Sequence, residues 1–176
     1  MPGAGSDLQQ ETVHATCIVV HEAGILIRGT AGSGKSTLGL SLLDRAAQAG
    51  LHASLVGDDR VRVFRHADRL VARPHPALSR LIEVHSLGIF RTCSHLDAAV
   101  LRLVVDLVED MPRLPDPGGA EAELLGVSLA RLTIDRRLRA AGLGATLVLD
   151  ALAARSPGVA ARTHWPTLAW ADRPDV

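Results

Sequence analysis

Residues 25–36 read Ile-Leu-Ile-Arg-Gly-Thr-Ala-Gly-Ser-Gly-Lys-Ser, an apolar run that passes directly into a glycine-rich segment. The second part of this stretch, Gly29–Ser36, fits the pattern G-x-x-x-x-G-K-[ST]. Apolar residues then recur at helical spacing over Thr37–Ala49, and Gly50 is a suitable residue to end that helix. A strand, a glycine-rich loop and a helix in this order are the context in which the pattern forms a phosphate-binding loop.

The chemistry of a phosphate-binding loop explains the spacing of these residues. Glycines let the backbone curl around an anion so that successive N–H groups point inward, and the helix N-terminus adds positive potential. We expect Lys35 to reach the β- and γ-phosphates of a nucleoside triphosphate, and the Ser36 hydroxyl to ligate Mg²⁺. Lys35 is the single lysine of the chain, so the pattern would arise by chance in roughly one such sequence in a thousand. The predicted nucleotide-binding residues are Gly29, Thr30, Ala31, Gly32, Ser33, Gly34, Lys35, Ser36 and Thr37.

The overall composition argues against several other classes of function. The 19 basic and 19 acidic residues cancel, so no basic surface for nucleic acid or for an anionic membrane is expected. No apolar run reaches the roughly 18 residues that a membrane-spanning helix needs, and the polar N-terminus does not resemble a signal peptide. Cys17 and Cys93 are too few for a disulfide framework and suit a reducing compartment. We therefore expect a cytoplasmic protein that binds neither nucleic acid nor membrane.

The remaining pattern predicts one α/β domain over residues 1–155, followed by an irregular tail over residues 156–176. Apolar runs bounded by turn residues predict a strand-rich middle, and Arg136–Ala154, mostly Ala, Leu and Arg, predicts a final helix. Because a helix connects them, we expect the strands Ile25–Arg28 and Ala53–Val56 to form a parallel pair. The other predicted strands are Thr16–Val20, Val61–Arg65, Leu70–Arg73, Leu81–Val84, Leu87–Phe90, Val100–Val108 and Leu129–Ile134.

An acidic pair, Asp58-Asp59, follows the strand that is expected to run parallel to the strand before the phosphate-binding loop. Ligands of open α/β sheets lie beyond the carboxyl ends of the strands, so both carboxylates are expected near the γ-phosphate. One carboxylate would help to hold Mg²⁺, and the other would accept the proton of an acceptor hydroxyl. A solvated turn is the alternative interpretation, because Gly-Asp-Asp-Arg is also favourable turn chemistry.

Glu83 is a further acidic candidate, because it lies in the apolar run Leu81-Ile82-Glu83-Val84. A carboxylate in such a setting needs a partner, and a metal ion is one such partner. The alternative is a glutamate on an edge strand that points to water. The eight histidines show no zinc-binding spacing, so a zinc site is not expected.

These segments together resemble the C-terminal catalytic domain of HPr kinase/phosphorylase, a bifunctional enzyme that acts on a serine of the phosphocarrier protein HPr. The resemblance runs from about His14 to Ala154, and Gly29–Ser36 is similar to the phosphate-binding loop of the family. Val56–Val61 resembles the family segment Ala-Asp-Asp-Arg-Val, and Leu81–Ile89 resembles its signature Glu-Ile-Arg-Gly-x-Gly-Ile. The resemblance covers no N-terminal domain of the long members, so we expect a chain similar to the short proteobacterial forms.

The resemblance implies a P-loop kinase domain with a mixed, strand-rich sheet, with ATP and Mg²⁺ as cofactors and an HPr-type phosphocarrier protein as substrate. It implies that Asp58 is the base of the phosphorylation reaction and that His14 lies in the active site. It also implies that Glu83 ligates Mg²⁺ and that Arg113 is functional, since Arg113 falls where the family has Asp-Arg-Leu-Gly. The predicted catalytic residues are thus Asp58, His14, Lys35 and Arg113, and the predicted metal ligands are Ser36, Glu83 and Asp59.

The chain departs from the family in two segments that are tied to the reverse, phosphorolysis reaction and to regulation in the long members. His85 and Ser86 replace the Arg and Gly of the signature, and Leu132–Arg139 replaces an Ile-Pro-Val-Arg-Pro-Gly-Arg stretch. We therefore expect the kinase reaction, whereas the reverse reaction is not predicted and homo-oligomer formation is left open. Two alternatives stay open: a kinase for a small metabolite, and an ATP-binding regulatory module that transfers no phosphate.

Overall fold

The computed structural model describes residues 9–113 and 120–155, so that the predicted tail over residues 156–176 lies outside the described residues. Nine of the described strands join in one curved sheet, two more form a separate hairpin, and three α-helices complete the fold. The strands of the sheet are β1 (Gln10–Val13), β2 (Ala15–Val20), β3 (Ala23–Gly29), β4 (Ala53–Gly57), β5 (Val61–His66), β6 (Arg69–Pro74), β9 (Ala99–Leu107), β10 (Glu121–Leu124) and β11 (Val127–Ile134). The hairpin consists of β7 (Leu81–Val84) and β8 (Gly88–Arg91), and the helices are α1 (Lys35–Gln48), α2 (Arg136–Ala140) and α3 (Gly144–Ala153).

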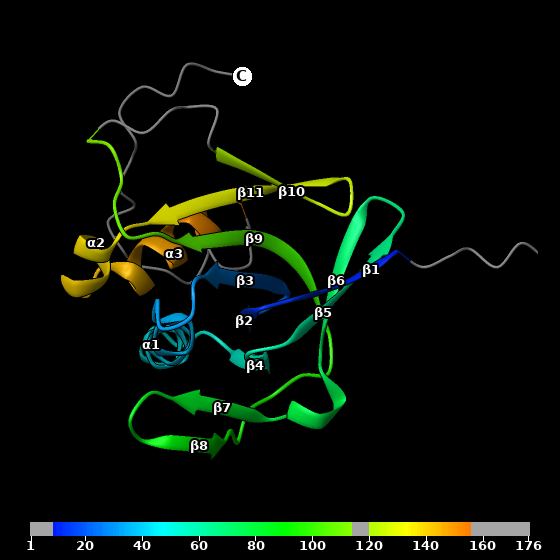
Figure 1. Cartoon of the computed structure of the whole chain (residues 1–176), viewed down its shortest axis with the longest axis horizontal. Helices are drawn as coiled ribbons and strands as arrows, with labels where there is room; N and C mark the ends of the chain where they lie inside the picture. Colours follow the sequence, from blue (N-terminus) through cyan, green and yellow to red (C-terminus); the bar gives the residue numbers. More distant parts are fainter. Residues whose placement is uncertain (1–8, 114–119, 156–176) are drawn as a thin grey trace, which may run out of the picture.

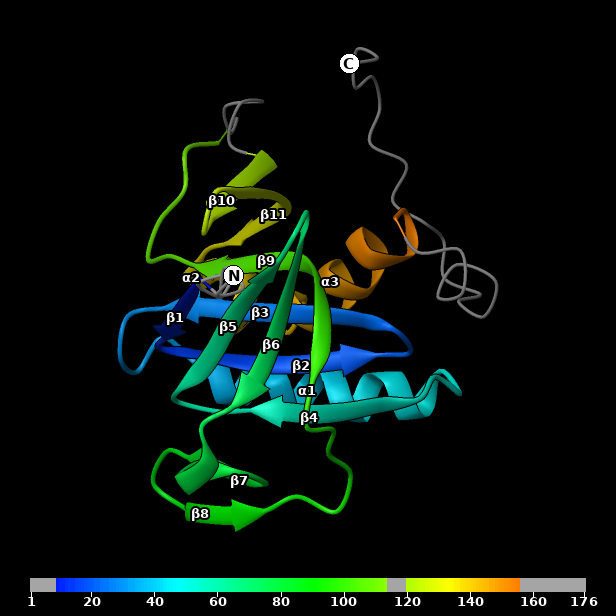
Figure 2. The same cartoon turned by 90° about the vertical axis from the view of Figure 1, so that its right-hand side faces the viewer.

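The sheet separates two hydrophobic cores, one on each face (Figures 1 and 2). Helices α1 and α3 cover one face, and β5 and β6 cross over the opposite face, as Figure 2 shows. Strand β9 connects the two parts, because its first residues pair with β6 and its later residues pair with β3 and β11. The core under the helices includes Ile18, Ile25, Ile27, Leu42, Leu55, Leu103, Val105 and Leu149. The core under β5 and β6 includes Cys17, Val19, Leu26, Val61, Val63, Leu70 and Leu101.

The order of strands corrects one prediction about the sheet. The sheet runs β1-β5-β6-β9-β3-β2-β4, so β3 and β4 point the same way but β2 lies between them, antiparallel to both. The prediction that β3 and β4 pair directly as parallel neighbours is therefore wrong. The physical reason is the short turn at His21 and Glu22, which makes β2 the immediate antiparallel neighbour of β3. The parallel neighbour of β3 is β9, and β11 adds a further parallel strand.

The predicted final helix over Arg136–Ala154 is wrong as a single helix. Residues 141–143 interrupt it, and Gly142 adopts a φ of +72°, which a residue inside an α-helix cannot have. The N–H of Gly142 bonds to the carbonyl of Arg139, and the N–H of Leu143 bonds to that of Leu138. This is the arrangement that ends a helix at a glycine, so α2 stops there and α3 starts in a new direction (Figure 1).

Two edge strands, β1 and β10, were missed by the sequence patterns. Each has only four residues, at least half of them polar, and they form by pairing with β5 and β11. The hairpin β2–β3, the helix α1 and the strands β4 to β9 agree with the predicted ranges to within a few residues. Across residues 9–113 and 120–155, no helix combines the length and apolarity that crossing a membrane requires.

Candidate active site

The segment between β3 and α1 forms a loop that turns back on itself. Gly32 and Gly34 have φ angles of +75° and +91°, values that favour glycine, and the N–H of Ser33 bonds to the carbonyl of Thr30 at 3.1 Å. Helix α1 begins directly after Gly34, so its free N–H groups face this loop. The conformation is the cradle that the glycine pattern predicted, with the positive end of a helix at its base.

Lys35 is the cation of this loop, and it is almost completely buried. Its Nζ donates hydrogen bonds to the carbonyl oxygens of Gly29 at 3.1 Å and Thr30 at 3.0 Å. Burial lowers the pKa of Lys35, while the charges of Asp58 and Asp59 act in the opposite direction. An ammonium group with so little hydration interacts strongly with any polyphosphate that enters the loop.

Asp58 occupies the centre of the site and is 5% exposed. Its carboxylate accepts a hydrogen bond of 2.5 Å from Thr16 Oγ1 and bonds of 3.0 Å from Ser36 Oγ to both of its oxygens. The backbone N–H of Glu83 donates a further bond of 3.0 Å. The residue thus connects β2, the first turn of α1 and the β7–β8 hairpin, and it lies beside the hydroxyl that was predicted to ligate Mg²⁺.

Asp59 has a different environment, because its side chain is half exposed and pairs with His14. The distance from His14 Nδ1 to Asp59 Oδ1 is 2.9 Å, and the same nitrogen lies 3.1 Å from the carbonyl oxygen of Asp59. Asp59 has a φ of +64°, which is uncommon for a residue with a side chain and is found preferentially at functional sites. This conformation lets two consecutive carboxylates follow one strand and still face different partners.

The side chains of the other two predicted residues, Glu83 and Arg113, make no hydrogen bond or ion pair with the phosphate-binding loop among the described residues. Glu83 lies beside Asp58 through its backbone, but its side chain is exposed, as the edge-strand alternative expected. Arg113 is exposed on the segment that follows β9, and among the described residues it makes no hydrogen bond or ion pair with the phosphate-binding loop. Lys35, Ser36, Asp58, Asp59 and His14 are therefore the predicted residues that the fold brings together.

The donor groups around Ser36 fit a magnesium ion that is shared with a nucleotide. Within residues 9–113 and 120–155, no three His, Cys, Asp or Glu side chains lie close enough to form a metal site by themselves. Mg²⁺ in nucleotide sites does not need such a cluster, because phosphates and water supply most of its six oxygen ligands. A serine hydroxyl at 3.0 Å from a carboxylate offers the one or two protein oxygens that such an ion requires.

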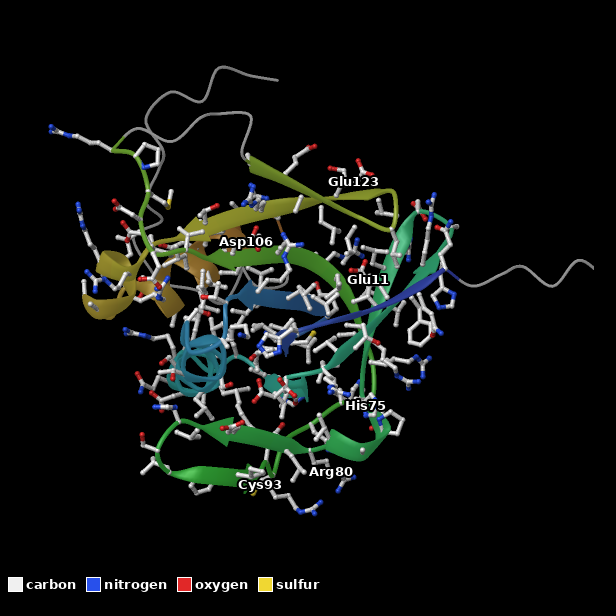
Figure 3. All side chains as sticks on the ribbon, viewed as in Figure 1. Glu11, His75, Arg80, Cys93, Asp106 and Glu123 are labelled. Carbon is white, nitrogen blue, oxygen red and sulfur yellow. The ribbon has the colours of Figure 1, made fainter. Side chains whose placement is uncertain are left out.

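A charged cluster beside the loop was missed by the sequence analysis. Arg28, the residue before Gly29, holds Asp106 of β9 through two hydrogen bonds, Nε to Oδ1 at 2.8 Å and Nη2 to Oδ2 at 2.9 Å. Arg131 Nε of β11 lies 2.6 Å from Asp106 Oδ2, a contact that is an ion pair without hydrogen-bond geometry. Figure 3 shows Asp106 among the strands that carry the loop. The cluster connects β3, β9 and β11 directly below the phosphate-binding loop.

The sequence shows the charged residues of this cluster, but it does not show that they pair with one another. Arg28 and Asp106 are charged residues at the ends of apolar strands, where a charge needs a counter-ion. Only the pairing of β3 with β9, which are about 75 residues apart in the chain, shows that they neutralise each other.

Comparison with known proteins identifies the chain. The family described as HPr Serine kinase C-terminal domain matches residues 7–114, which is more than half of the chain. The chain is 32% identical to HPr kinase/phosphorylase of Mycoplasma mycoides over 54% of its length, and 30% identical to that of Streptococcus salivarius over 82%. These matches cover 31% and 48% of the two relatives, so the chain spans half of their length or less.

A solved structure shares the fold. The structure of the Hpr(Ser) kinase/phosphatase from Coxiella burnetii aligns with a TM-score of 0.65 at 21% sequence identity. The alignment covers 83% of this chain and 99% of the other. The mixed, strand-rich P-loop fold that the sequence predicted is thereby confirmed.

Replacing Asp106 by Asn should destabilise the protein, because two arginines would then face each other without a counter-charge. The side chains of Arg28 and Arg131 are 27% and 32% exposed, so we expect a loss of about 2–3 kcal/mol, below the cost of breaking a fully buried pair. Asp110→Asn is the matched control, since its pair with Arg137 is exposed and should contribute under about 0.5 kcal/mol. Urea unfolding of both variants measures the difference, and equal stabilities would contradict the role assigned to Asp106.

Proposed function

The chain belongs to the family of the HPr serine kinase C-terminal domain, and from this we propose that it is an ATP-dependent protein serine kinase whose acceptor is an HPr-type phosphocarrier protein. The observation that carries the proposal is the contact of 3.0 Å between Ser36 of the phosphate-binding loop and the buried carboxylate of Asp58. This contact supports a role for Asp58 as the base, because phosphoryl transfer to a hydroxyl needs a carboxylate close to the phosphate that the loop would hold.

In this proposal the triphosphate of ATP lies along residues 29–37, with its β- and γ-phosphates at Lys35. The backbone N–H groups of the loop and the ammonium of Lys35 stabilise the negative charge on the transferred group. Ser36 and Asp59 are the residues proposed to hold Mg²⁺, with Glu83 joining through its exposed side chain. When bound, the ion supplies positive charge that neutralises the phosphate oxygens.

The chemical step uses Asp58 as general base. The oxygen of the acceptor serine forms a bond to the γ-phosphorus while the bond from that phosphorus to the bridging oxygen breaks, which leaves ADP. Asp58 accepts the proton of the serine hydroxyl. Its three hydrogen-bond donors, on Thr16, Ser36 and the backbone of Glu83, fix the orientation of the carboxylate. Most of the catalysis then comes from position and charge, as is usual for phosphoryl transfer.

A protein acceptor fits the surroundings of Asp58 better than a small metabolite does. The β7–β8 hairpin beside Asp58 carries the exposed apolar side chains of Leu87, Ile89 and Phe90, which are 73%, 69% and 47% accessible. Ile89 is the direct cross-strand partner of Glu83, so both side chains lie on the same face of the hairpin. An apolar surface next to the proposed base suits a macromolecular partner, whereas a small-molecule kinase would surround its substrate.

The proposal is tested by incubating the purified chain with ATP, Mg²⁺ and the HPr-like protein of the same cell, and mapping the modified residue by mass spectrometry. Phosphorylation of one serine is expected. Transfer to a panel of small alcohols instead would support the metabolite kinase, and ATP binding without any transfer would support the regulatory module.

Asp58→Asn should retain ATP binding and lose transfer, because an amide cannot accept the proton of the serine hydroxyl. We expect transfer to fall by about 10²–10⁴-fold at any Mg²⁺ concentration. Asp59→Asn is the paired variant: if Asp59 serves the metal, the Mg²⁺ concentration for half-maximal rate should rise while the rate at saturating Mg²⁺ largely recovers. A recovery of Asp58→Asn by added Mg²⁺ would show that the two roles are assigned the wrong way round.

Ile89→Ser should weaken binding of the acceptor protein and leave ATP binding unaffected, because Ile89 is exposed on the hairpin whose Glu83 contacts Asp58 and is not part of the phosphate-binding loop. We expect the KM for the acceptor to increase by roughly five- to twentyfold, as for removal of an apolar contact at an interface. Leu96→Ser is a suitable control, since Leu96 is also an exposed apolar residue, 40% accessible, but lies on the segment between β8 and β9. An equal effect of both variants would argue against docking at β7–β8.

A further inference from the structure

The outer face of β5 and β6 carries most of the basic side chains of these two strands. In Figure 2, both strands cross in front of the main sheet. Alternation along the strands directs Val61, Val63 and Leu70 into the core, so the residues between them point outward. The outward residues of the two strands are Arg62, Phe64, His66, Arg69, Val71 and Arg73.

The register of the strands places an apolar row across the middle of this face. Phe64 of β5 is the cross-strand partner of Val71 of β6, and Val71 is the partner of Val100 of β9. Cross-strand partners lie on the same side of a sheet, so the three side chains form one continuous stripe. All three are partly exposed, which leaves the stripe accessible to another molecule.

Basic side chains flank the apolar row on both sides. Arg62 and Arg73 are direct cross-strand partners on one side. On the other side, His66 and Arg69 are direct partners. His66 follows Arg62 by four positions on β5, so the two basic rows are roughly 13 Å apart. The turn between the strands contributes one acidic residue, Asp68, whose carboxylate lies 4.0 Å from Arg69.

The positive charge of this face is not neutralised within the described chain. A carboxylate neutralises arginines elsewhere in the fold, as Asp106 does between Arg28 and Arg131. By contrast, the side chains of Arg62 and Arg73 make no hydrogen bond or ion pair with residues 9–113 or 120–155. Like charges directly opposite each other destabilise a pair of strands, and an anion bound between them removes that cost. The face therefore suits an anionic partner.

The sequence gave no sign of this face. Because the charges of the whole chain cancel, no basic surface was expected. That expectation is wrong here, because strand alternation gathers on one side the basic residues of β5 and β6.

An acidic protein segment fits this face better than a nucleic acid does. Single-stranded nucleic acids stack their bases on free aromatic rings. The ring of Phe64 is not free, because the guanidinium of Arg62 lies over it, 5.5 Å from its centre. An apolar stripe bordered by charge is instead the composition of a protein interface, to which arginines and aromatic residues contribute most.

The dimensions of the face suit an amphipathic helix that lies along the apolar row. A helix with its side chains is about 10–12 Å wide, which fits between basic rows roughly 13 Å apart. Apolar residues of the helix at positions i, i+3, i+4 and i+7 contact the stripe in this arrangement. Acidic residues beside them then reach the arginines on either side.

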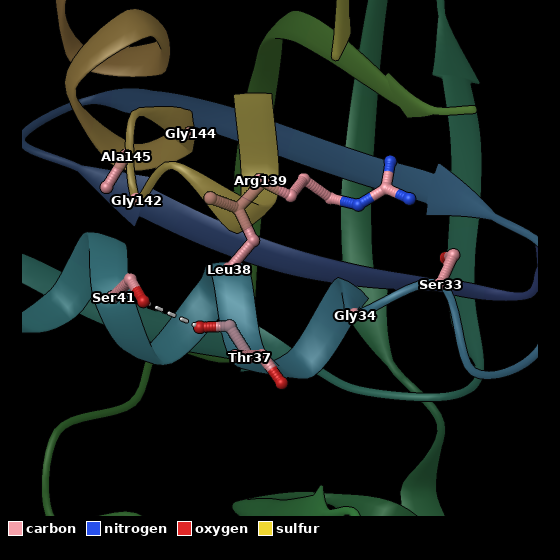
Figure 4. Close-up of a pocket in the computed structure, with 9 residues that line it drawn as sticks. All are labelled: Ser33, Gly34, Thr37, Leu38, Ser41, Arg139, Gly142, Gly144 and Ala145. Carbon is pink, nitrogen blue, oxygen red and sulfur yellow. Dashed lines mark hydrogen bonds between the residues drawn. The ribbon is translucent and has the colours of Figure 1, made fainter. Parts of the chain in front are cut away.

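We propose that the outer face of β5 and β6 docks an acidic amphipathic helix of a partner protein. This surface is separate from the proposed acceptor surface on β7–β8, which lies below it in Figure 2, and it does not depend on the kinase reaction. It is also separate from the pocket drawn in Figure 4, which is lined by residues of the phosphate-binding loop, α1, α2 and the start of α3.

A labelled helical peptide tests the proposal by fluorescence anisotropy. The peptide carries leucines at helical spacing with glutamates on both sides, and its matched control carries lysines in place of the glutamates. One protein variant combines Arg69→Glu with Arg73→Glu, because both side chains are exposed. The control variant combines Arg91→Glu with Arg136→Glu, which makes the same change of charge at exposed arginines of β8 and α2.

The unchanged protein should bind the acidic peptide and not the basic one. Its affinity should fall at least about fivefold when the salt concentration rises from about 0.05 M to about 0.3 M, since salt screens exposed charges. The change at Arg69 and Arg73 should lower the affinity at least about tenfold, whereas the control variant should stay within about twofold of the unchanged protein.

Failure to bind the acidic peptide, equal binding of the two peptides, or equal affinities of the two variants would overturn the proposal. Tighter binding of an oligouridylate or of phosphatidylserine vesicles through the same two arginines would assign the face to nucleic acid or membrane instead. A self-associated protein that the change at Arg69 and Arg73 dissociates in sedimentation would place a second copy of the chain on this face. Phosphate transfer is not measured, so none of these results bears on the proposed function.

Discussion

The burial of one carboxylate organises this structure. Asp58 is almost inaccessible to water, and a buried carboxylate is tolerated only where hydrogen-bond donors surround it. Its donors come from three separate segments: Thr16 on β2, Ser36 on α1 and the backbone of Glu83 on β7. The same contacts that satisfy Asp58 therefore position the phosphate-binding loop against the hairpin. The arrangement of the site therefore depends on the contacts of Asp58.

A second constraint comes from the sheet below the loop. The loop is anchored at its start by Arg28, which is bound to Asp106 of the neighbouring parallel strand. It is anchored at its end by α1, whose apolar face packs on the sheet. A loop held rigidly at both ends can present its N–H groups without reorganisation when charge develops, which is the condition for electrostatic catalysis.

The sequence alone predicted those parts of the molecule that depend on local patterns. The hairpin β2–β3, the glycine loop and α1 follow from alternation, glycine spacing and helical periodicity, and all three are confirmed. Three features could not be predicted from the sequence, because they depend on contacts between distant segments. They are the edge strands β1 and β10, the position of β2 between β3 and β4, and the partners of Arg28. The helix break at Gly142 was missed because the surrounding Ala, Leu and Arg residues favour a continuous helix. The capping hydrogen bonds at Gly142 outweigh that preference and end α2. The roles of Asp58, Asp59, Glu83 and Arg113 stay predictions.

Lys35 and the loop form the proposed polyphosphate site, on which the proposed function depends. The decisive measurement is the affinity for Mg-ATP of the unchanged protein and of Lys35→Met, which keeps the length of the side chain and removes its charge. We expect saturable binding by the unchanged protein and an affinity roughly a hundredfold lower in Lys35→Met, since a charge-assisted contact to phosphate disappears. An affinity for ATP that is the same in both proteins would contradict the proposed polyphosphate site.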